Sequence, residues 1–259
     1  HVTISGTNLG SSTMEVYGGR SRGIGDAKDN TVDFGGSSHA QKIFGGYLTN
    51  ETGTGEASGN TVAVSGGSVH TVLGGAVVGR GKLHHNTVTI SGGTVANVYG
   101  GQIDNANTES EASENTVTIK GNSGTISNVY GGHANKAGGA TKNTVNVSGG
   151  SASNLYGGYA VQTGAASENM VDVSGGSAST IYGGYGKSSG AVKDNTVNIS
   201  GNGTVTTVYG GYTNNCGAAD GNKVNISGGR INGTIRGGYT DAGGSANGNK
   251  VAISGGTGI

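Results

Sequence analysis

The chain has 259 residues, of which 57 are glycine, none is proline or tryptophan, and only 12% are charged. This composition excludes both a helix-rich core and the charge content of a disordered tail. The 15 basic and 15 acidic residues cancel and are interspersed, which excludes the basic surface of a nucleic-acid-binding protein, and no apolar stretch is long enough for direct membrane insertion by this segment.

The tripeptide Asn-x-Val recurs along the whole chain. Its copies begin 26 to 30 residues apart, at Asn30, Asn60, Asn86, Asn115, Asn143, Asn169, Asn195, Asn222 and Asn249. A period in this range indicates stacked repeats that bury their apolar faces only against one another. We therefore predict one continuous β-solenoid over residues 1–259, with about nine coils of 26–30 residues. Because partial copies stand at both ends, we expect a window cut from a longer protein.

Each Asn precedes a predicted strand in which apolar and polar residues alternate. A Val stands two residues after the Asn, and an aliphatic residue or Phe stands four residues after it. Residues two apart lie on the same side of a strand, so these pairs are predicted to face the core. The predicted core residues include Val88, Ile90, Val117, Ile119, Val145, Val147, Val171, Val173, Val197 and Ile199.

The Asn column itself has two interpretations. An Asn at the same corner of successive coils can hydrogen-bond to its counterparts above and below, and such ladders stabilise stacked strands. A row of carbohydrate ligands would instead need amides that face solvent, and the neighbouring column of buried Val argues against this. We therefore predict a structural ladder of Asn86, Asn115, Asn143, Asn169, Asn195 and Asn222.

A second short strand follows a Ser-Gly-Gly-like turn in each coil. It ends in an aliphatic residue and then usually an aromatic one, as in Val98-Tyr99, although two copies have Leu73 and Arg236 in the second place. Neighbours on a strand point to opposite faces, so the aliphatic residue is predicted to point inward and the aromatic one outward. A Gly-Gly pair follows in every copy, and we predict that it turns a corner that requires positive φ.

A third column lies three residues before each Asn and is always small or apolar, for example Ala112, Ala140 and Val192. The segment before it is polar and variable, so we expect one tighter side of the coil that carries the sequence variation. Two strands, this tighter side and three turns fit one coil of a parallel β-helix, an all-β fold. With coils about 4.8 Å apart, nine of them make a rod roughly 43 Å long.

The outward aromatic residues are predicted to form lines along the rod. They either stack from coil to coil and stabilise the solenoid, or form a lateral binding strip, since Tyr offers a rigid amphipathic surface to a protein or a sugar. The first set is Tyr99, Tyr130, Tyr156, Tyr182 and Tyr209, and the second set, just after the Gly-Gly pairs, is Tyr47, Tyr159, Tyr185, Tyr212 and Tyr239.

The residues predict no catalytic site, no cofactor and no metal site. Asp33 and Asp172 are the only acidic residues between the inward pairs of the first strand, and at five coils apart, roughly 24 Å, they form no acid/base pair. The pair His84-His85 lies in a loop without a carboxylate or thiolate beside it, which argues against a metal site. The single cysteine, Cys216, has no partner within the chain. Rows of outward Thr would suit an ice-binding face, but they are interrupted.

The succession Asn-Thr-Val-x-Ile-Ser-Gly-Gly, then Val-Tyr-Gly-Gly-Tyr, then a polar loop before the next Asn resembles the passenger-domain repeats of bacterial autotransporter adhesins, which use type V secretion. The resemblance covers essentially the whole chain and is best seen in residues 143–184. It implies a right-handed parallel β-helix, exported through an outer-membrane barrel. The chain would be extracellular, either secreted or displayed on the bacterial cell surface and anchored through a segment not present here.

The resemblance also implies a non-enzymatic function in virulence: attachment to host or microbial cells through a surface protein or glycan of unknown identity. Binding loops in such adhesins are often insertions, and no segment between a Gly-Gly pair and the next Asn exceeds 13 residues here, which favours a stalk. The alternative is a structural extracellular fibre or matrix protein that acts by self-association. Flanking sequence with a terminal barrel would decide the secretion route.

Overall fold

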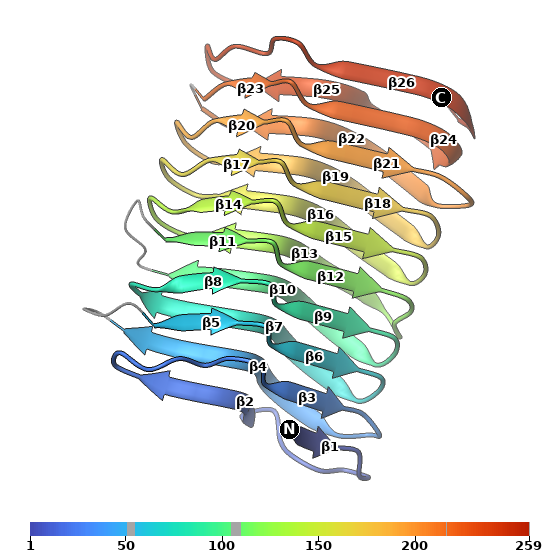
Figure 1. Ribbon diagram of the computed structural model, residues 1–259. Helices are drawn as coiled ribbons and strands as arrows, with labels where there is room; N and C mark the ends of the chain where they lie inside the picture. Colours follow the sequence, from blue (N-terminus) through green and yellow to red (C-terminus); the bar gives the residue numbers. More distant parts are fainter. Residues whose placement is uncertain (51–54, 105–109, 216, 259) are drawn as a thin grey trace.

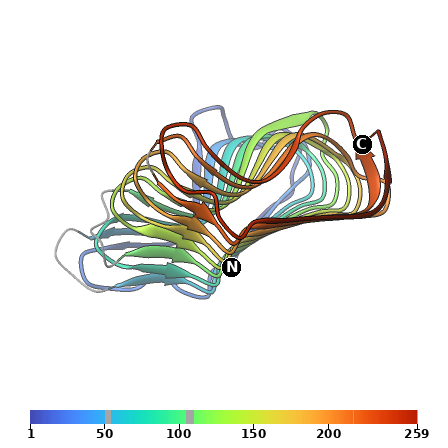
Figure 2. The ribbon, with the colours of Figure 1, turned by 90° about the horizontal axis from the view of Figure 1, so that it is seen from above.

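The chain folds as a parallel β-solenoid, seen from the side in Figure 1 and along its axis in Figure 2. The computed structural model describes residues 1–50, 55–104, 110–215 and 217–258, and within these ranges every regular element is a β-strand. Strands of neighbouring coils pair in parallel and in register, so that Val117 lies between Val88 and Val145. The prediction of an all-β solenoid with about nine coils is confirmed.

A typical coil contains three strands, which we call the front, long and short strands. The front strands follow the Asn column and are β1 (Val2–Ile4), β3 (Thr31–Phe34), β6 (Thr61–Val64), β9 (Thr87–Ile90), β12 (Thr116–Ile119), β15 (Thr144–Val147), β18 (Met170–Val173), β21 (Thr196–Ile199), β24 (Lys223–Ile231) and β26 (Lys250–Thr257). The long strands are β2 (Glu15–Arg22), β4 (His39–Asn50), β7 (Ser68–Gly79), β10 (Thr94–Asp104), β13 (Thr125–Ala134), β16 (Ser151–Ala160), β19 (Ser177–Gly186), β22 (Thr204–Thr213) and β25 (Ile235–Thr240). The short strands are β5 (Glu56–Ser58), β8 (Lys82–His84), β11 (Glu111–Ser113), β14 (Gly139–Thr141), β17 (Ala166–Ser167), β20 (Val192–Lys193) and β23 (Ala219–Asp220).

The short strands correct the prediction of two strands per coil. They form a separate seven-stranded sheet along the tighter side. Each contributes one inward residue, such as Ala112 or Ala140, and both of these are 0% exposed. Two or three residues are too few to show an alternating pattern, so only pairing with the neighbouring coils reveals the strand.

The coil is right-handed. In Figure 1 the front strands run from left to right, the long strands run from right to left behind them, and the chain rises from the N-terminus to the C-terminus. A chain that turns in this sense while it advances follows a right-handed screw, which agrees with the handedness that the resemblance implies.

The core has a larger part that runs the length of the rod and a smaller part that consists of separate clusters. The larger part lies between the front strands and the first halves of the long strands, where Ile119 packs with residues such as Val129. The smaller part lies between the second halves of the long strands and the short strands, as with Ile103 and Ala112. The predicted core residues, Val88 to Ile199, all belong to the larger part and are at most 2% exposed.

The Gly-Gly pairs do not turn a corner with positive φ, so that prediction is wrong. Gly157 and Gly158 lie inside β16, and neither has positive φ. A Cβ on Gly158 would lie 2.3 Å from Nδ2 of Asn169, and one on Gly157 would lie 2.3 Å from the carbonyl oxygen of Gly183. The pair is glycine because the long strand passes against the Asn column. The coil has two lobes with a narrow waist between them, as Figure 2 shows.

Positive φ occurs instead at the second glycine of several Ser-Gly-Gly-like turns, such as Gly150 and Gly176, and in a column that the sequence analysis missed. The residue directly before each ladder Asn has φ between 54° and 68°; these residues are Asp29, Gly59, His85, Glu114, Lys142, Glu168, Asp194, Gly221 and Gly248. A left-handed backbone costs a non-glycine residue on the order of 1 kcal/mol, and stacking imposes it nevertheless. Mixed residue types hid this column, because only three of its members are glycine.

Candidate functional site

The Asn column forms a continuous hydrogen-bonded ladder inside the waist. Nδ2 and the backbone N–H of Asn143 both donate to Oδ1 of Asn169, at 3.0 and 2.9 Å. Nδ2 also donates to the carbonyl oxygen of Ala112, at 2.8 Å. The ladder members are at most 1% exposed and comprise Asn86, Asn115, Asn143, Asn169, Asn195 and Asn222. Their amides therefore serve the stacking of coils and do not reach a carbohydrate in solvent.

The outward residues that flank the Gly-Gly pairs form two rows along the rod. The first row, directly before the pairs, is Tyr17, Phe44, Leu73, Tyr99, Tyr130, Tyr156, Tyr182, Tyr209 and Arg236. The second row, directly after the pairs, is Arg20, Tyr47, Ala76, Gln102, His133, Tyr159, Tyr185, Tyr212 and Tyr239. All tyrosines of the predicted strip lie in these rows. Arg20, Gln102 and His133 were missed, although each follows a Gly-Gly pair.

Rings stack face to face within each row. Tyr156 lies between Tyr130 and Tyr182, with ring centroids 4.8 and 5.0 Å away and planes within 8°. In the second row, Tyr159 and Tyr185 stack at 4.8 Å with planes 2° apart. The two rows meet edge to face, as in the pair Tyr156 and Tyr159, at 5.2 Å and 90°. Such contacts each contribute about 0.5–1.5 kcal/mol, so the rows stabilise the rod.

Stacking also decides what the rows offer to a ligand. A ring that lies between two others has both faces covered, so its edge and its hydroxyl group remain for contact with solvent. Tyr130, Tyr156 and Tyr182 are all half-buried in this way. Burial raises the pKa of the Tyr156 hydroxyl, and it raises that of Tyr182 to about 12. Tyr130, Tyr156 and Tyr182 therefore present a line of neutral hydroxyl groups along the first row.

Each row has an arginine at one end: Arg20 is the first member of the second row, and Arg236 is the last member of the first row. The guanidinium carbon of Arg20 lies 4.9 Å from the ring centre of Tyr17 and 5.4 Å from that of Tyr47. Arg236 lies 4.4 Å from the ring centre of Tyr239, and its Nη1 donates to the Tyr209 hydroxyl at 3.1 Å. A cation over a ring face is attracted by the quadrupole of the ring.

His133 is the one titratable residue that is fully enclosed by these rows. Its ring stacks on Tyr159 at 5.0 Å and meets Tyr130 edge on at 5.0 Å. It is 8% exposed, and its Nδ1 has no hydrogen-bond partner among the described residues. Burial lowers the pKa of His133 to about 4, although Asp104 opposes this shift.

This shift predicts acid destabilisation. Between pH 6.5 and 4 the imidazole of His133 is protonated in the unfolded chain but stays neutral in the folded one. The free energy of unfolding therefore decreases as the pH is lowered, by up to about 3 kcal/mol. We expect His133→Tyr to continue the row into Tyr159 and to remove this part of the slope. Urea unfolding at several pH values measures it.

His70→Ser is the matched control, because His70 is an exposed histidine on β7. This variant keeps the buried His133, so it should retain the acid destabilisation that His133 causes. A His133→Tyr variant that loses as much stability between pH 6.5 and 4 as the wild type would contradict the burial of a neutral His133.

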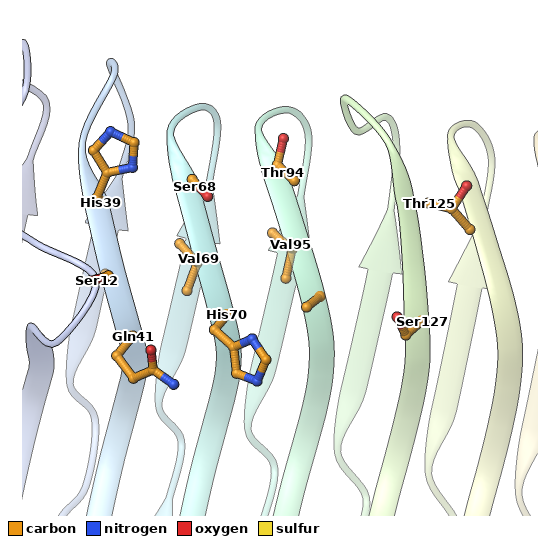
Figure 3. Close-up of a pocket in the computed structure, with 12 residues that line it drawn as sticks. Ser12, His39, Gln41, Ser68, Val69, His70, Thr94, Val95, Thr125 and Ser127 are labelled. Atoms are coloured by element: carbon orange, nitrogen blue, oxygen red, sulfur yellow. The ribbon is translucent and has the colours of Figure 1, made fainter.

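An open groove of about 400 Å³ lies on the outer faces of β4, β7, β10 and β13, near the beginning of these strands. Figure 3 shows its polar side chains on successive coils, with His39 and His70 at different heights along their strands. The two imidazoles therefore do not converge on one point. The lining is mixed: the polar residues are Ser12, His39, Gln41, Ser68, His70, Thr94, Thr125 and Ser127, and the apolar ones are Ala40, Val69, Val95 and Ala96.

Stacking does bring carboxylates to the His84-His85 pair, which the sequence analysis did not expect. Nε2 of His85 lies 2.6 Å from a carboxylate oxygen of Glu114, and Nε2 of His84 lies 3.9 Å from one of Glu56. These carboxylates come from other coils or other loops, so the linear sequence gives no signal for them. Within the described ranges, no group of three or more His, Cys, Asp or Glu side chains is placed to hold a metal ion. Cys216 lies outside the described residues.

Asp33 and Asp172 occupy one column five coils apart, as their spacing predicts. Asp33 contacts Nε2 of His1 at 2.8 Å, and Asp172 accepts a hydrogen bond from Nδ2 of Asn198 at 2.5 Å. Each carboxylate is thus engaged locally and remote from the other.

Comparison with known proteins finds no matching family model, no matching curated protein and no matching solved structure. In the part of the chain that the structure describes, no helix is long and apolar enough to cross a membrane.

Proposed function

We propose that this chain is the β-helical stalk or passenger region of a non-enzymatic, autotransporter-like adhesin that attaches a bacterium to host or microbial cells. The observation that carries the proposal is the uninterrupted in-register stacking of the coils, with the Asn ladder inside and the two aromatic rows outside. A rod of this kind resists bending because each coil contacts its neighbours through three strands. Such stiffness suits a protein that holds an adhesive surface away from a cell.

Lateral attachment is the form of adhesion that the described residues support best. The rows present half-buried tyrosines on one side of the rod for nearly its full length, and Tyr is well suited to contacts with proteins and sugars. Because stacked rings expose edges and hydroxyl groups, attachment along the uninterrupted part of the strip would depend on hydrogen bonds. A partner would be a surface protein or a glycan.

The test is attachment of the purified chain to host and microbial cells, compared with a triple variant, Tyr156→Leu, Tyr182→Leu and Tyr209→Leu. Leucine is chosen because Leu73 already occupies this row, so the variant should stay folded, which circular dichroism checks. Attachment that is lost in the variant supports lateral adhesion. Attachment that the variant retains locates the contact elsewhere on the rod. Concentration-dependent filaments without attachment to any cell would contradict the proposal and favour the self-associating fibre.

A further inference from the structure

We infer that the interruption of the two rows at Leu73 and Ala76 is a binding site for an uncharged sugar ring. The inference deepens the proposed function and rests on it, because it adds one sugar site, at the gap in the rows, to the lateral attachment along Tyr156, Tyr182 and Tyr209. It follows from three features of this coil: an open ring face, a groove with an apolar floor, and a rim that carries both donors and acceptors.

The open ring face belongs to Tyr47. Its neighbours in the second row are Arg20 on one side and Ala76 on the other. The guanidinium of Arg20 lies 5.4 Å from the ring centre, whereas the methyl group of Ala76 is too small to cover the opposite face. No described ring from the coil of Ala76 or the following coil contacts Tyr47. A sugar stacks its C–H groups on an aromatic face, whereas rings such as Tyr130, Tyr156, Tyr182 and Tyr185 have neighbouring rings on both faces.

The space over Ala76 is a groove of about 360 Å³, within the range of small-molecule sites. Its floor consists of Phe44, Leu73 and Ala76, which are 6%, 3% and 5% exposed and pack together. The second row resumes with Gln102, two coils beyond Tyr47, which is a separation of about 10 Å. A gap of this height takes one ring between Tyr47 and Gln102, in place of the aromatic side chain that the row lacks.

The rim carries groups of both signs. Glu15 and Lys42 lie two residues before the first row on their strands, whereas Gln102 belongs to the second row and Asp104 lies two residues after it. Nε2 of Gln102 is 3.3 Å from a carboxylate oxygen of Asp104, while Lys42 forms no ion pair with a described residue. An anionic ligand would meet Glu15 and Asp104, and a cationic one would meet Lys42 and Arg20. A neutral polyol uses the donors and the acceptors alike, so an uncharged saccharide fits the rim best.

The test measures binding of neutral oligosaccharides of hexose and N-acetylhexosamine units to the whole chain by saturation-transfer NMR and calorimetry. Acidic oligosaccharides and p-cresol serve as competing probes. We expect a neutral saccharide to bind, and Ala76→Tyr, which fills the gap with a ring, to weaken binding at least 10-fold (about 1.4 kcal/mol). Tyr185→Leu is the control, because Tyr185 is a remote member of the second row and should leave the affinity unchanged.

Several results would overturn the inference. These are binding of no neutral saccharide, stronger binding of the acidic or the aromatic probe, or an Ala76→Tyr protein that folds and binds as well as the wild type. If Ala76→Tyr does not fold, Tyr47→Leu removes the open ring face and should weaken binding to the same extent; unchanged affinity would again overturn the inference. The cell-attachment assay separates the two proposals. Wild-type protein that attaches to cells but binds no neutral saccharide overturns the sugar site alone, and protein that binds the saccharide but attaches to no cell overturns the proposed function.

Discussion

Replacing Asn143 by alanine is expected to lower the free energy of unfolding by about 3–5 kcal/mol. The side chain makes four hydrogen bonds: Nδ2 donates to Asn169 Oδ1 and to the Ala112 carbonyl, and Oδ1 accepts from the backbone N–H and Nδ2 of Asn115. Asn143 is 0% exposed, so water does not replace these bonds, and alanine leaves their partners buried and unsatisfied. Urea unfolding followed by circular dichroism measures the loss.

Asn146→Ala is the matched control for this substitution. Asn146 lies on β15 between the buried residues Val145 and Val147, and its side chain is on the outer side. Its replacement should change the free energy of unfolding by no more than about 0.5 kcal/mol. If the two substitutions cost the same, the ladder is not what holds the waist together.

The second large effect is expected at the glycine that faces the ladder. A Cβ on Gly158 would lie 2.3 Å from Nδ2 of Asn169 and 2.7 Å from the carbonyl oxygen of Ala140. Both atoms are fixed, because that Nδ2 donates to that carbonyl at 2.9 Å. Gly158→Ala should therefore cost at least about 3 kcal/mol, or prevent folding, by forcing the long strand away from the waist. Thermal and urea unfolding measure the change.

Gly121→Ala separates this steric effect from a general intolerance of glycine substitution. The nearest heavy atom to a Cβ on Gly121 is the carbonyl oxygen of Ser91, 3.6 Å away, and its φ is not positive. We expect a change within about 0.5 kcal/mol, since the space is open and alanine restricts the unfolded chain. Wild-type stability of Gly158→Ala would show that the waist is loosely packed.

The Asn ladder and the glycines that face it depend on each other sterically. Asn169 needs a flat backbone beside it, and Gly158 provides one because it has no side chain; Asn143 and Gly132 repeat the arrangement in the coil before. The strand bends at this point, and the residues on its two flanks, Tyr156 and Tyr159, therefore meet edge to face on the outside. The internal ladder and the external rows are consequences of one geometric feature of the coil.

The repeat, the parallel solenoid and the inward face of the front strands could all be predicted from the order of the residues. These follow from local order: a Val two residues after every Asn, with an aliphatic residue or Phe two further on, allows only one strand face to be buried. The residue order also predicts the asparagine and tyrosine columns, because identical residues at identical phases must stack when coils pair in register.

What those columns do depends on contacts between coils, which the residue order does not show. The Gly-Gly pair looked like a corner, since the sequence shows a glycine but not the Asn169 amide that a Cβ at Gly158 would strike from another coil. The residue order suggests tyrosine rings with exposed faces, but stacked rings cover the faces of their neighbours. One face of Tyr47 stays open because its neighbour in the second row is Ala76. Contacts between residues about 27 positions apart create these features, and no local pattern records the distance between side chains on different coils.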